Sequence, residues 1–123
     1  DALAGSGVFR LFVASLGDRI AAGQQVFAYA GYVYLAGVSV ADWVYSEKVP
    51  ANDLLQWRVL NWAVDTGQRV VDFGGAQPES ADPKIQRIDA FKSRWGTTLS
   101  ESLTIGRRGP LLRRAAAALV QAI

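Results

Sequence analysis

Hydrophobic and polar residues alternate over most of the first third of the chain. These stretches are rich in Val, Phe and Tyr, and a period of two is typical of strands that bury one face. Gly-Asp at 17–18 and Ala-Gly at 30–31 separate the stretches and favour tight turns. Ala-Ala-Gly at 21–23 indicates a bulge or a close backbone approach. The pattern therefore predicts a three-stranded antiparallel meander over about residues 8–40.

A long apolar run follows a loop that mixes aromatic residues, charges and a proline. The run LLQWRVLNWAVDTG predicts a helix over about residues 53–66, capped by Asp53 or Asn52, with Gln56 at a capping-box spacing from Asp53. One narrow polar stripe is expected to face water: Arg58, Asn61 and Asp65. The rest of the circumference is expected to pack on the sheet, and it includes both tryptophans of the run, Trp57 and Trp62.

The second half of the chain alternates between strand patterns and helical patterns. RVVDF predicts a strand over residues 69–73, and PKIQRIDAFKSRW predicts a helix over about 83–95 with Asp82 as its N-cap. TTLSESLTIG predicts a strand over about 97–105, and LLRRAAAALVQAI predicts an amphipathic helix over about 110–122. A meander followed by a helix and a strand predicts an α/β (α+β) fold whose last strand lies parallel to an earlier one.

Two features of this half carry candidate chemistry. Gly74-Gly75, directly after a strand, allow a positive φ or the close approach of a ligand, or they only turn the corner. Lys92 lies at the border of an apolar arc of the second helix, whose members are Ile85, Ile88, Phe91 and Trp95. A lysine in that position either extends its ammonium to water or meets an anion.

Composition excludes several kinds of chemistry. The stretch VVDFGG contains the Asp-Phe-Gly of protein kinases, but a kinase needs an H-R-D catalytic loop and the 123 residues include no His. Without His or Cys, thiol catalysis, Ser-His-Asp catalysis and Cys/His zinc sites are excluded, and no metal site is expected. The absence of Cys is typical of a reducing cytosol, so we expect a cytoplasmic single domain over residues 1–123.

Charge is distributed unevenly along the chain. Residues 1–66 carry four basic and six acidic side chains, whereas residues 67–123 carry nine basic and five acidic ones. The second half therefore presents either a solvated basic face or a surface that meets phosphate, nucleic acid or anionic lipid. The arginines of the last predicted helix allow contact with anionic lipid or a partner, or the helix packs on its own domain.

Three stretches, LLQWRVLNWAVDTG, RVVDFGG and IDAFKSRWG, resemble in order and spacing the FemAB-like branch of the GNAT acyltransferase superfamily. Members of that branch have a leucine-rich helix, a strand that ends in DFGG, and an FK-x-x-[WF]-G motif about twenty residues later. The resemblance covers about residues 8–105. It implies a GNAT-like, mostly antiparallel mixed sheet with flanking helices, in a chain that corresponds to the C-terminal part of a GNAT domain.

The resemblance also implies an activity, the transfer of an acyl or aminoacyl group to an amine in cell-wall (peptidoglycan) or polysaccharide biosynthesis. Its partners would be a small-molecule or lipid-linked acceptor, tRNA, a membrane surface, and a second copy of the chain or a preceding domain. The donor would be aminoacyl-tRNA or acyl-CoA, with no tightly bound cofactor. The segment before the central helix, VSVADWVYSEKVPAND, lacks the glycine pattern with which acetyl-CoA-dependent members bind pyrophosphate. A non-catalytic interaction or dimerisation domain with the same fold is the alternative.

Site residues follow from the same motifs. The resemblance assigns Lys92 and Asp72 as catalytic groups, and Gly74, Gly75, Phe91, Arg94 and Trp95 as substrate-binding groups. Lys92 matches the family lysine, which is thought to meet a charged substrate or to stabilise developing charge. Asp72 is either the acceptor of the amine proton or a structural acid that orders the glycine loop.

Overall fold

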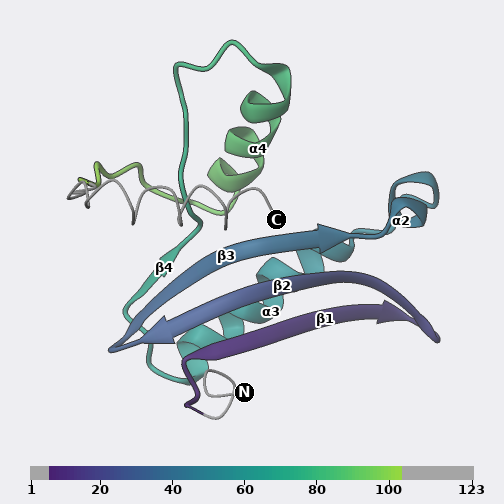
Figure 1. Cartoon of the computed structure of the whole chain (residues 1–123), viewed down its shortest axis with the longest axis horizontal. Coiled ribbons are helices and arrows are strands. Elements are labelled where there is room, and N and C mark those ends of the chain that lie inside the picture. The colour runs from purple at the N-terminus through teal and green to yellow at the C-terminus, as the bar shows by residue number, and fades with distance from the viewer. Residues whose placement is uncertain (1–5, 104–123) are drawn as a thin grey trace, which may run out of the picture.

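The computed structural model describes residues 6–103, which form one four-stranded sheet and three helices (Figure 1). The strands are β1 (Phe9–Leu16), β2 (Arg19–Tyr29), β3 (Tyr32–Val40) and β4 (Val70–Asp72), in the spatial order β1-β2-β3-β4. The helices are α2 (Asp42–Ser46), α3 (Ala51–Asp65) and α4 (Pro83–Ser93). The first three strands are antiparallel and β4 runs parallel to β3, so the mixed, mostly antiparallel α/β class is confirmed.

Two-residue turns join the strands of the meander at the positions that the sequence indicated. Gly17 has φ +59°, and Ala30 and Gly31 have φ +51° and +83°. The Ala30-Gly31 turn has positive φ at both central residues and the Gly17-Asp18 turn only at the first, and both kinds of turn have a twist that matches that of their strands. Ala21 is the extra residue of a β-bulge, because Ala14 pairs with Ala22 and Ser15 pairs with Ile20.

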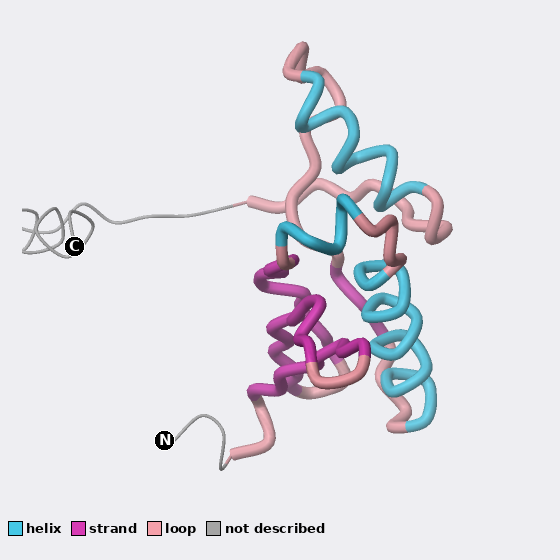
Figure 2. The backbone as a smooth tube through the Cα atoms, turned by 90° about the vertical axis from the view of Figure 1, so that its right-hand side faces the viewer, coloured by secondary structure: helices cyan, strands magenta, loops and turns pink. Residues whose placement is uncertain are grey.

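Helix α3 covers one face of the sheet and builds the core there (Figure 2). One buried cluster forms where Leu55 meets small residues of β1 and β2, and a second forms where Val59 and Ala63 meet β2 and β3. Side chains of a strand alternate between its two faces. Residues of β3 that point away from α3 are therefore exposed, and the whole open face presents Leu11, Val13, Tyr29, Tyr32, Tyr34 and Val70 to solvent.

The start of α3 differs from the sequence-based prediction. The N-cap is Pro50, without a side-chain cap, and the expected capping box of Asp53 and Gln56 does not form because Gln56 turns toward the sheet and is buried. The preceding segment, which was expected to be a loop, contains the short helix α2. The sequence did not predict this helix because the segment is rich in residues that favour turns. At the other end Gly67 (φ +68°) closes the helix, with the N–H of Gln68 bonded to the carbonyl of Ala63 at 2.8 Å.

Two further expectations need correction. Trp57 was expected in the core but is 58% exposed, because the sheet covers only one side of α3. The strand expected over about 97–105 does not form in residues 97–103, which are exposed and have no strand beside them to supply a ladder. Its remainder and the helix expected over about 110–122 lie outside the described residues. Within residues 6–103 no helix is long and apolar enough to cross a membrane.

Candidate functional site

The parallel ladder between β3 and β4 is short, and the two strands separate just beyond it. Tyr32 pairs with Val70, Val33 with Val71, and Tyr34 with Asp72; no further pair follows. Strand β3 continues to Val40, whereas the chain after Asp72 turns away toward α4, which stands beyond the end of β4 (Figure 1). In the described part of the chain, the edge of β3 beyond Tyr34 therefore has no strand partner on this side.

A bulge lies in the same unpaired part of β3. Gln25 pairs with Gly37 and Val26 pairs with Leu35, so Ala36 has no partner residue on β2. A bulge re-aims the backbone groups of its strand, and such features often lie beside functional sites. Around Ala36, β3 thus has neither a register partner on β2 nor, among the described residues, a strand partner on the side of β4.

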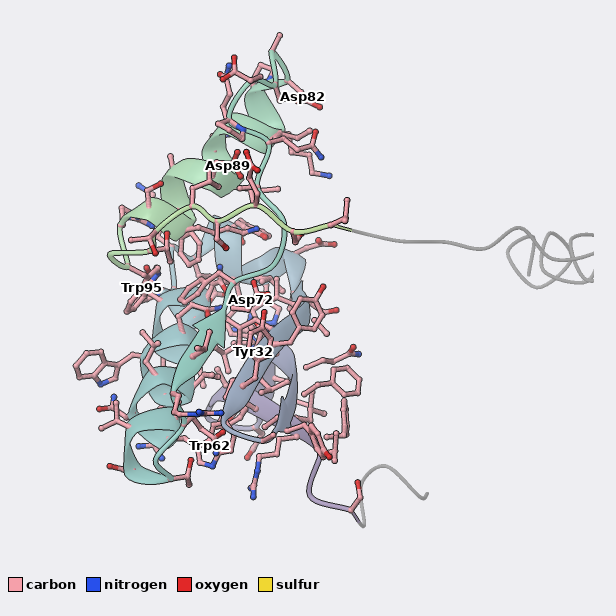
Figure 3. The ribbon with its side chains drawn as sticks, turned by 90° about the vertical axis from the view of Figure 1, so that its left-hand side faces the viewer. Tyr32, Trp62, Asp72, Asp82, Asp89 and Trp95 are labelled. Carbon is pink, nitrogen blue, oxygen red and sulfur yellow. The ribbon has the colours of Figure 1, made fainter. Side chains whose placement is uncertain are left out.

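Asp72 is held at the end of β4 by two neutral donors. The hydroxyl of Tyr32 donates to Oδ2, and the N–H of Gly74 donates to Oδ1 at 2.7 Å (Figure 3). Because Tyr32 donates to a carboxylate, the pKa of its hydroxyl is raised above the ordinary value of 10.0. The bond from Gly74, which has φ +76°, fixes the turn that follows the strand.

Lys92 connects α4 to this turn. Its ammonium donates to the carbonyl oxygen of Gly75 and, at 3.4 Å, to that of Gly74. The side chain is of intermediate burial, and its ammonium has no acidic partner among the described residues. Asp89 on the same helix accepts from the N–H of Gln77 at 2.9 Å, which fixes the loop at a second point.

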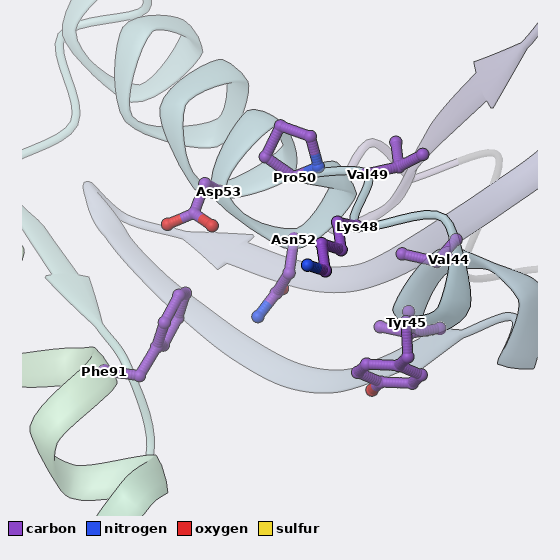
Figure 4. A pocket seen from close by; sticks show the side chains of 9 residues that line it. Val44, Tyr45, Lys48, Val49, Pro50, Asn52, Asp53 and Phe91 are labelled. Carbon is purple, nitrogen blue, oxygen red and sulfur yellow. The ribbon is translucent and has the colours of Figure 1, made fainter.

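A cavity of about 340 Å³ lies between the end of β3, the start of α3 and α4 (Figure 4). Its lining comprises Val40, Val44, Tyr45, Lys48, Val49, Pro50, Asn52, Asp53 and Phe91. The ammonium of Lys48 has no acidic partner among the described residues, and Lys48 has φ +54° in the turn before α3. Phe91 is the one sequence-predicted site residue that lines this cavity.

Arg94 and Trp95 lie at the end of α4 near Phe91. The guanidinium of Arg94 lies 5.2 Å from the centre of the Phe91 ring, and Nη2 reaches Oδ1 of Asp53 at 3.7 Å. Both partners of this ion pair are more than half exposed, so it contributes little to stability. Trp95 meets Phe91 edge-on at 6.4 Å, and its indole N–H is buried with no hydrogen-bond partner among residues 6–103.

The expected site residues thus fall into two neighbouring groups. One group surrounds the end of β4 and contains Asp72, Gly74, Gly75 and Lys92; the other lies at the end of α4 and contains Phe91, Arg94 and Trp95. Sequence reasoning missed Tyr32 and Tyr34, because a parallel register cannot be read from a single strand pattern. It also missed Lys48, whose only signal was its place just before the central helix. No group of acidic side chains in residues 6–103 is arranged to hold a metal ion.

The fold is that of the acyl-transferring GNAT domains. It combines an antiparallel meander, a helix across one face of the sheet and a parallel strand that separates from its neighbour. Residues 1–93 match the family model described as the acetyltransferase (GNAT) domain, and the chain belongs to this family. No curated protein sequence matches the chain.

Solved structures show the same fold. The chain is similar to aminoglycoside N-acetyltransferase AAC(6')-Iy in complex with CoA, with a TM-score of 0.60 and 15% identity over 89% of this chain and 86% of that one. It is also similar to AAC(6')-Iy in complex with the bisubstrate analogue CoA-S-monomethyl-acetylneamine, with a TM-score of 0.59 and 16% identity over 89% and 78% of the two chains.

Proposed function

We propose that the protein transfers an acyl group from an activated donor to an amine. The single observation that carries this proposal is the separation of β4 from β3, which leaves the β3 edge around Ala36 without a strand partner among the described residues, on the same strand as Val40 of the cavity. An acyl carbonyl placed at this edge would meet backbone N–H groups of β3. Such donors are suited to stabilise the negative oxygen of a tetrahedral intermediate.

The reaction requires few groups from the protein. The neutral amine attacks the acyl carbonyl, a C–N bond forms, and the bond between carbonyl carbon and the leaving sulfur or oxygen breaks. The proton that the amine loses is transferred, directly or through solvent, to the leaving group, so atoms and charge balance. Positioning and oxyanion stabilisation supply most of the acceleration in such a scheme.

Two sequence-predicted catalytic residues have separate roles in this proposal. Lys92 fixes the carbonyls of Gly74 and Gly75 and so holds the turn after β4 to α4. Asp72 lies at the point where the strands separate, with its orientation fixed by Tyr32 and Gly74. In this proposal Asp72 orients the amine or accepts its proton.

The donor is the less defined partner, and acyl-CoA is the first candidate. AAC(6')-Iy, which has the same fold, is seen in complex with CoA. The start of the fifteen-residue helix α3 lines the cavity together with Lys48, whose ammonium has no acidic partner among the described residues, and both favour phosphate groups, whereas Asp53 in the first turn of α3 opposes them. Aminoacyl-tRNA carries phosphates as well and remains the second candidate. A cell-wall muropeptide is one amine acceptor consistent with the FemAB-like motifs, and the reaction would then take place in the cytoplasm.

A non-catalytic interaction domain is the alternative, and one observation favours it. The sheet face opposite α3 exposes several large apolar side chains, and β1 is an unpaired edge strand in the described residues. Exposed edges and apolar faces favour association. Such a domain would need neither the separation of β4 from β3 nor a fixed carboxylate.

The test is a transfer assay with purified protein, acetyl-CoA and a panel of primary amines, followed by release of the CoA thiol and by the mass of the amide. We expect amine-dependent release, and a decrease of up to about 100-fold in Lys92→Met, because loss of the bonds to the glycine loop misplaces the reacting groups. Lys84→Met, on the exposed side of the same helix, is the matched control and should retain activity. Absence of amine-dependent release with both acetyl-CoA and aminoacyl-tRNA would contradict the proposal.

A further inference from the structure

We propose that Gln24 is a positioning residue for acyl transfer, because its side-chain amide fixes the bulge of β3 and so directs the N–H of Val38 to the edge where the acyl oxygen would lie. This inference rests on the proposed transfer activity and deepens it, since it names the side chain that orients the reacting site. Gln24 lies buried under α3 and acts through the backbone of β3, without touching donor or acceptor.

Two carbonyl groups show how the bulge at Ala36 turns the β3 backbone. In a regular strand the backbone repeats with a period of two, so the carbonyls of residues i and i+2 point to the same side. The carbonyl oxygen of Leu35 lies toward the end of β4, 3.7 Å from the position that a Cβ on Gly74 would occupy. The carbonyl oxygen of Gly37 instead accepts from Gln24, which belongs to β2 on the other side. The bulge thus reverses the direction of the backbone groups between Leu35 and Gly37.

The reversal decides which N–H group faces the side of β4. The N–H and C=O of one residue in a strand point the same way, because a hydrogen-bonded pair exchanges both bonds. Gly37 therefore turns both groups toward β2, and Val38 turns its N–H toward the side from which β4 has separated. Without the bulge this direction would fall to Gly37, which would move the donor along the strand by one residue, or roughly 3.4 Å.

Gln24 holds the bulge from both strands at once. Its Nε2 donates to the carbonyl oxygen of Gln25 on β2 at 3.0 Å and to that of Gly37 on β3 at 2.9 Å. The side chain is only 3% exposed, so water does not compete for these bonds. A buried amide with one acceptor on each strand fixes the offset of the two strands at the bulge.

Gln56 fixes the orientation of this amide. Its Nε2 donates to Oε1 of Gln24 at 3.0 Å, so a flip of the Gln24 amide would lose this bond and would bring Oε1 against two carbonyl oxygens. The same nitrogen of Gln56 lies 3.5 Å from Oδ1 of Asn52, and Asn52 lines the cavity (Figure 4). The amide side chains therefore set the position of the bulge relative to the start of α3, where the donor is proposed to bind.

Steady-state kinetics of Gln24→Met test this role. Methionine has nearly the length of glutamine but no amide, so it removes the contacts at the bulge and leaves the residues that line the cavity unchanged. We expect kcat to fall about 10- to 100-fold and the KM for acetyl-CoA to change less than about threefold, because a displaced N–H acts on the transition state. Gln25→Met, the matched control, replaces the neighbouring exposed glutamine on the other face of β2 and should keep the wild-type kcat and KM.

The kinetic comparison must separate positioning from stability. Partial unfolding would lower kcat without a change in KM, so each kcat is referred to the folded fraction of that variant, measured by urea unfolding. A loss of kcat per folded molecule in Gln24→Met alone supports the positioning role. Wild-type kcat in Gln24→Met, equal losses in the two glutamine variants, or a loss confined to KM would overturn it.

A measurement on the wild type decides the case in which Gln24→Met does not fold. The amide NMR signal of Val38 is followed with acetyl-carba(dethia)-CoA, in which a CH2 group replaces the thioester sulfur and prevents transfer, and with CoA, which has no acyl carbonyl. We expect the ketone to move the Val38 amide proton downfield and CoA to leave it in place, because only the ketone offers an acceptor at this edge. An unmoved signal, or the same shift with both compounds, would contradict the inference.

Failure of this inference and failure of the proposed function give different results. A wild type that transfers no acyl group from either donor rejects the proposed function and the inference with it. Transfer by the wild type that continues at full kcat in Gln24→Met rejects the positioning role alone and retains the transferase.

Discussion

Gln56 of α3 donates through Nε2 to Oε1 of Gln24 on β2 at 3.0 Å, and both side chains are buried. Gln24 in turn donates to the carbonyl oxygens of Gln25 and Gly37, at 3.0 and 2.9 Å. These carbonyls flank the bulge at Ala36, so the glutamine pair connects α3 to the irregular part of the sheet.

Gln56→Leu should destabilise the protein because it leaves Oε1 of Gln24 buried without a donor. The expected loss is about 1–3 kcal/mol in the free energy of unfolding, measured by urea denaturation. Asn61→Leu on the same helix removes a bond only to a carbonyl of its own helix, and we expect a change within about 0.5 kcal/mol. Similar losses of unfolding free energy in the two variants would show that the buried Gln56–Gln24 hydrogen bond contributes no more to stability than the exposed bond of Asn61.

Leu55→Ala and Leu54→Ala compare the two sides of α3. Leu55 is 2% exposed and its truncation should cost about 2–5 kcal/mol, since it leaves a cavity against β1 and β2. Leu54 is 50% exposed, and its truncation should cost less than about 1 kcal/mol. Thermal or urea unfolding of both variants measures the difference, and a costly Leu54→Ala would mean that a partner covers that side of α3.

Gly74→Ala and Gly75→Ala compare two adjacent glycines. Gly74 has φ +76°, a backbone conformation that costs other L-residues about 1–2 kcal/mol, although an added Cβ would meet no atom closer than 3.7 Å. Gly75 has no positive φ and open space around it, so its replacement should be neutral or stabilise by up to about 1 kcal/mol. The free energy of unfolding distinguishes the two, and equal effects would argue against a strained turn at Gly74.

The hydroxyl of Tyr32 should ionise above the ordinary tyrosine pKa of 10.0. The pKa of its hydroxyl is raised, first by the hydrogen bond to Asp72, then by desolvation and by the charge of Asp72. Because the pKa in the folded state exceeds the unfolded value of about 10, this contribution to stability is complete below that pH and is lost as pH rises through the folded value. Tyrosinate absorbance should show one late step that Tyr32→Phe removes and Asp72→Asn moves to lower pH. A step unchanged by Asp72→Asn would contradict this assignment.

The sequence predicted most elements because their patterns are local. Alternation located the meander, and Gly17 and Gly31 marked the reversals through the positive φ that they supply. The end of α3 followed from Gly67 for the same reason. Its start did not, because Pro50 begins the helix without a capping side chain and the burial of Gln56 depends on a partner in β2.

The candidate site was only partly accessible from the sequence. The DFGG and FKxxWG motifs brought Asp72, Gly74, Gly75 and Lys92 into one hypothesis, and the structure connects Lys92 to the glycine loop. That Tyr32 faces Asp72 depends on which strand β4 joins and in which register, and both are set by packing of Val71 and Phe73 against α3. Such long-range choices have no local signature.

The brevity of β4 has a consequence for how activity would be lost on heating. Only three residue pairs fasten this strand to β3, while β1, β2 and β3 share long ladders and the core under α3. Local opening starts where few bonds must break, so the amides of β4 and the glycine turn should exchange with solvent before those of the meander. The part of the molecule that carries Asp72 would then come apart as a separate, earlier event. Inactivation would occur at temperatures at which circular dichroism still reports an intact fold.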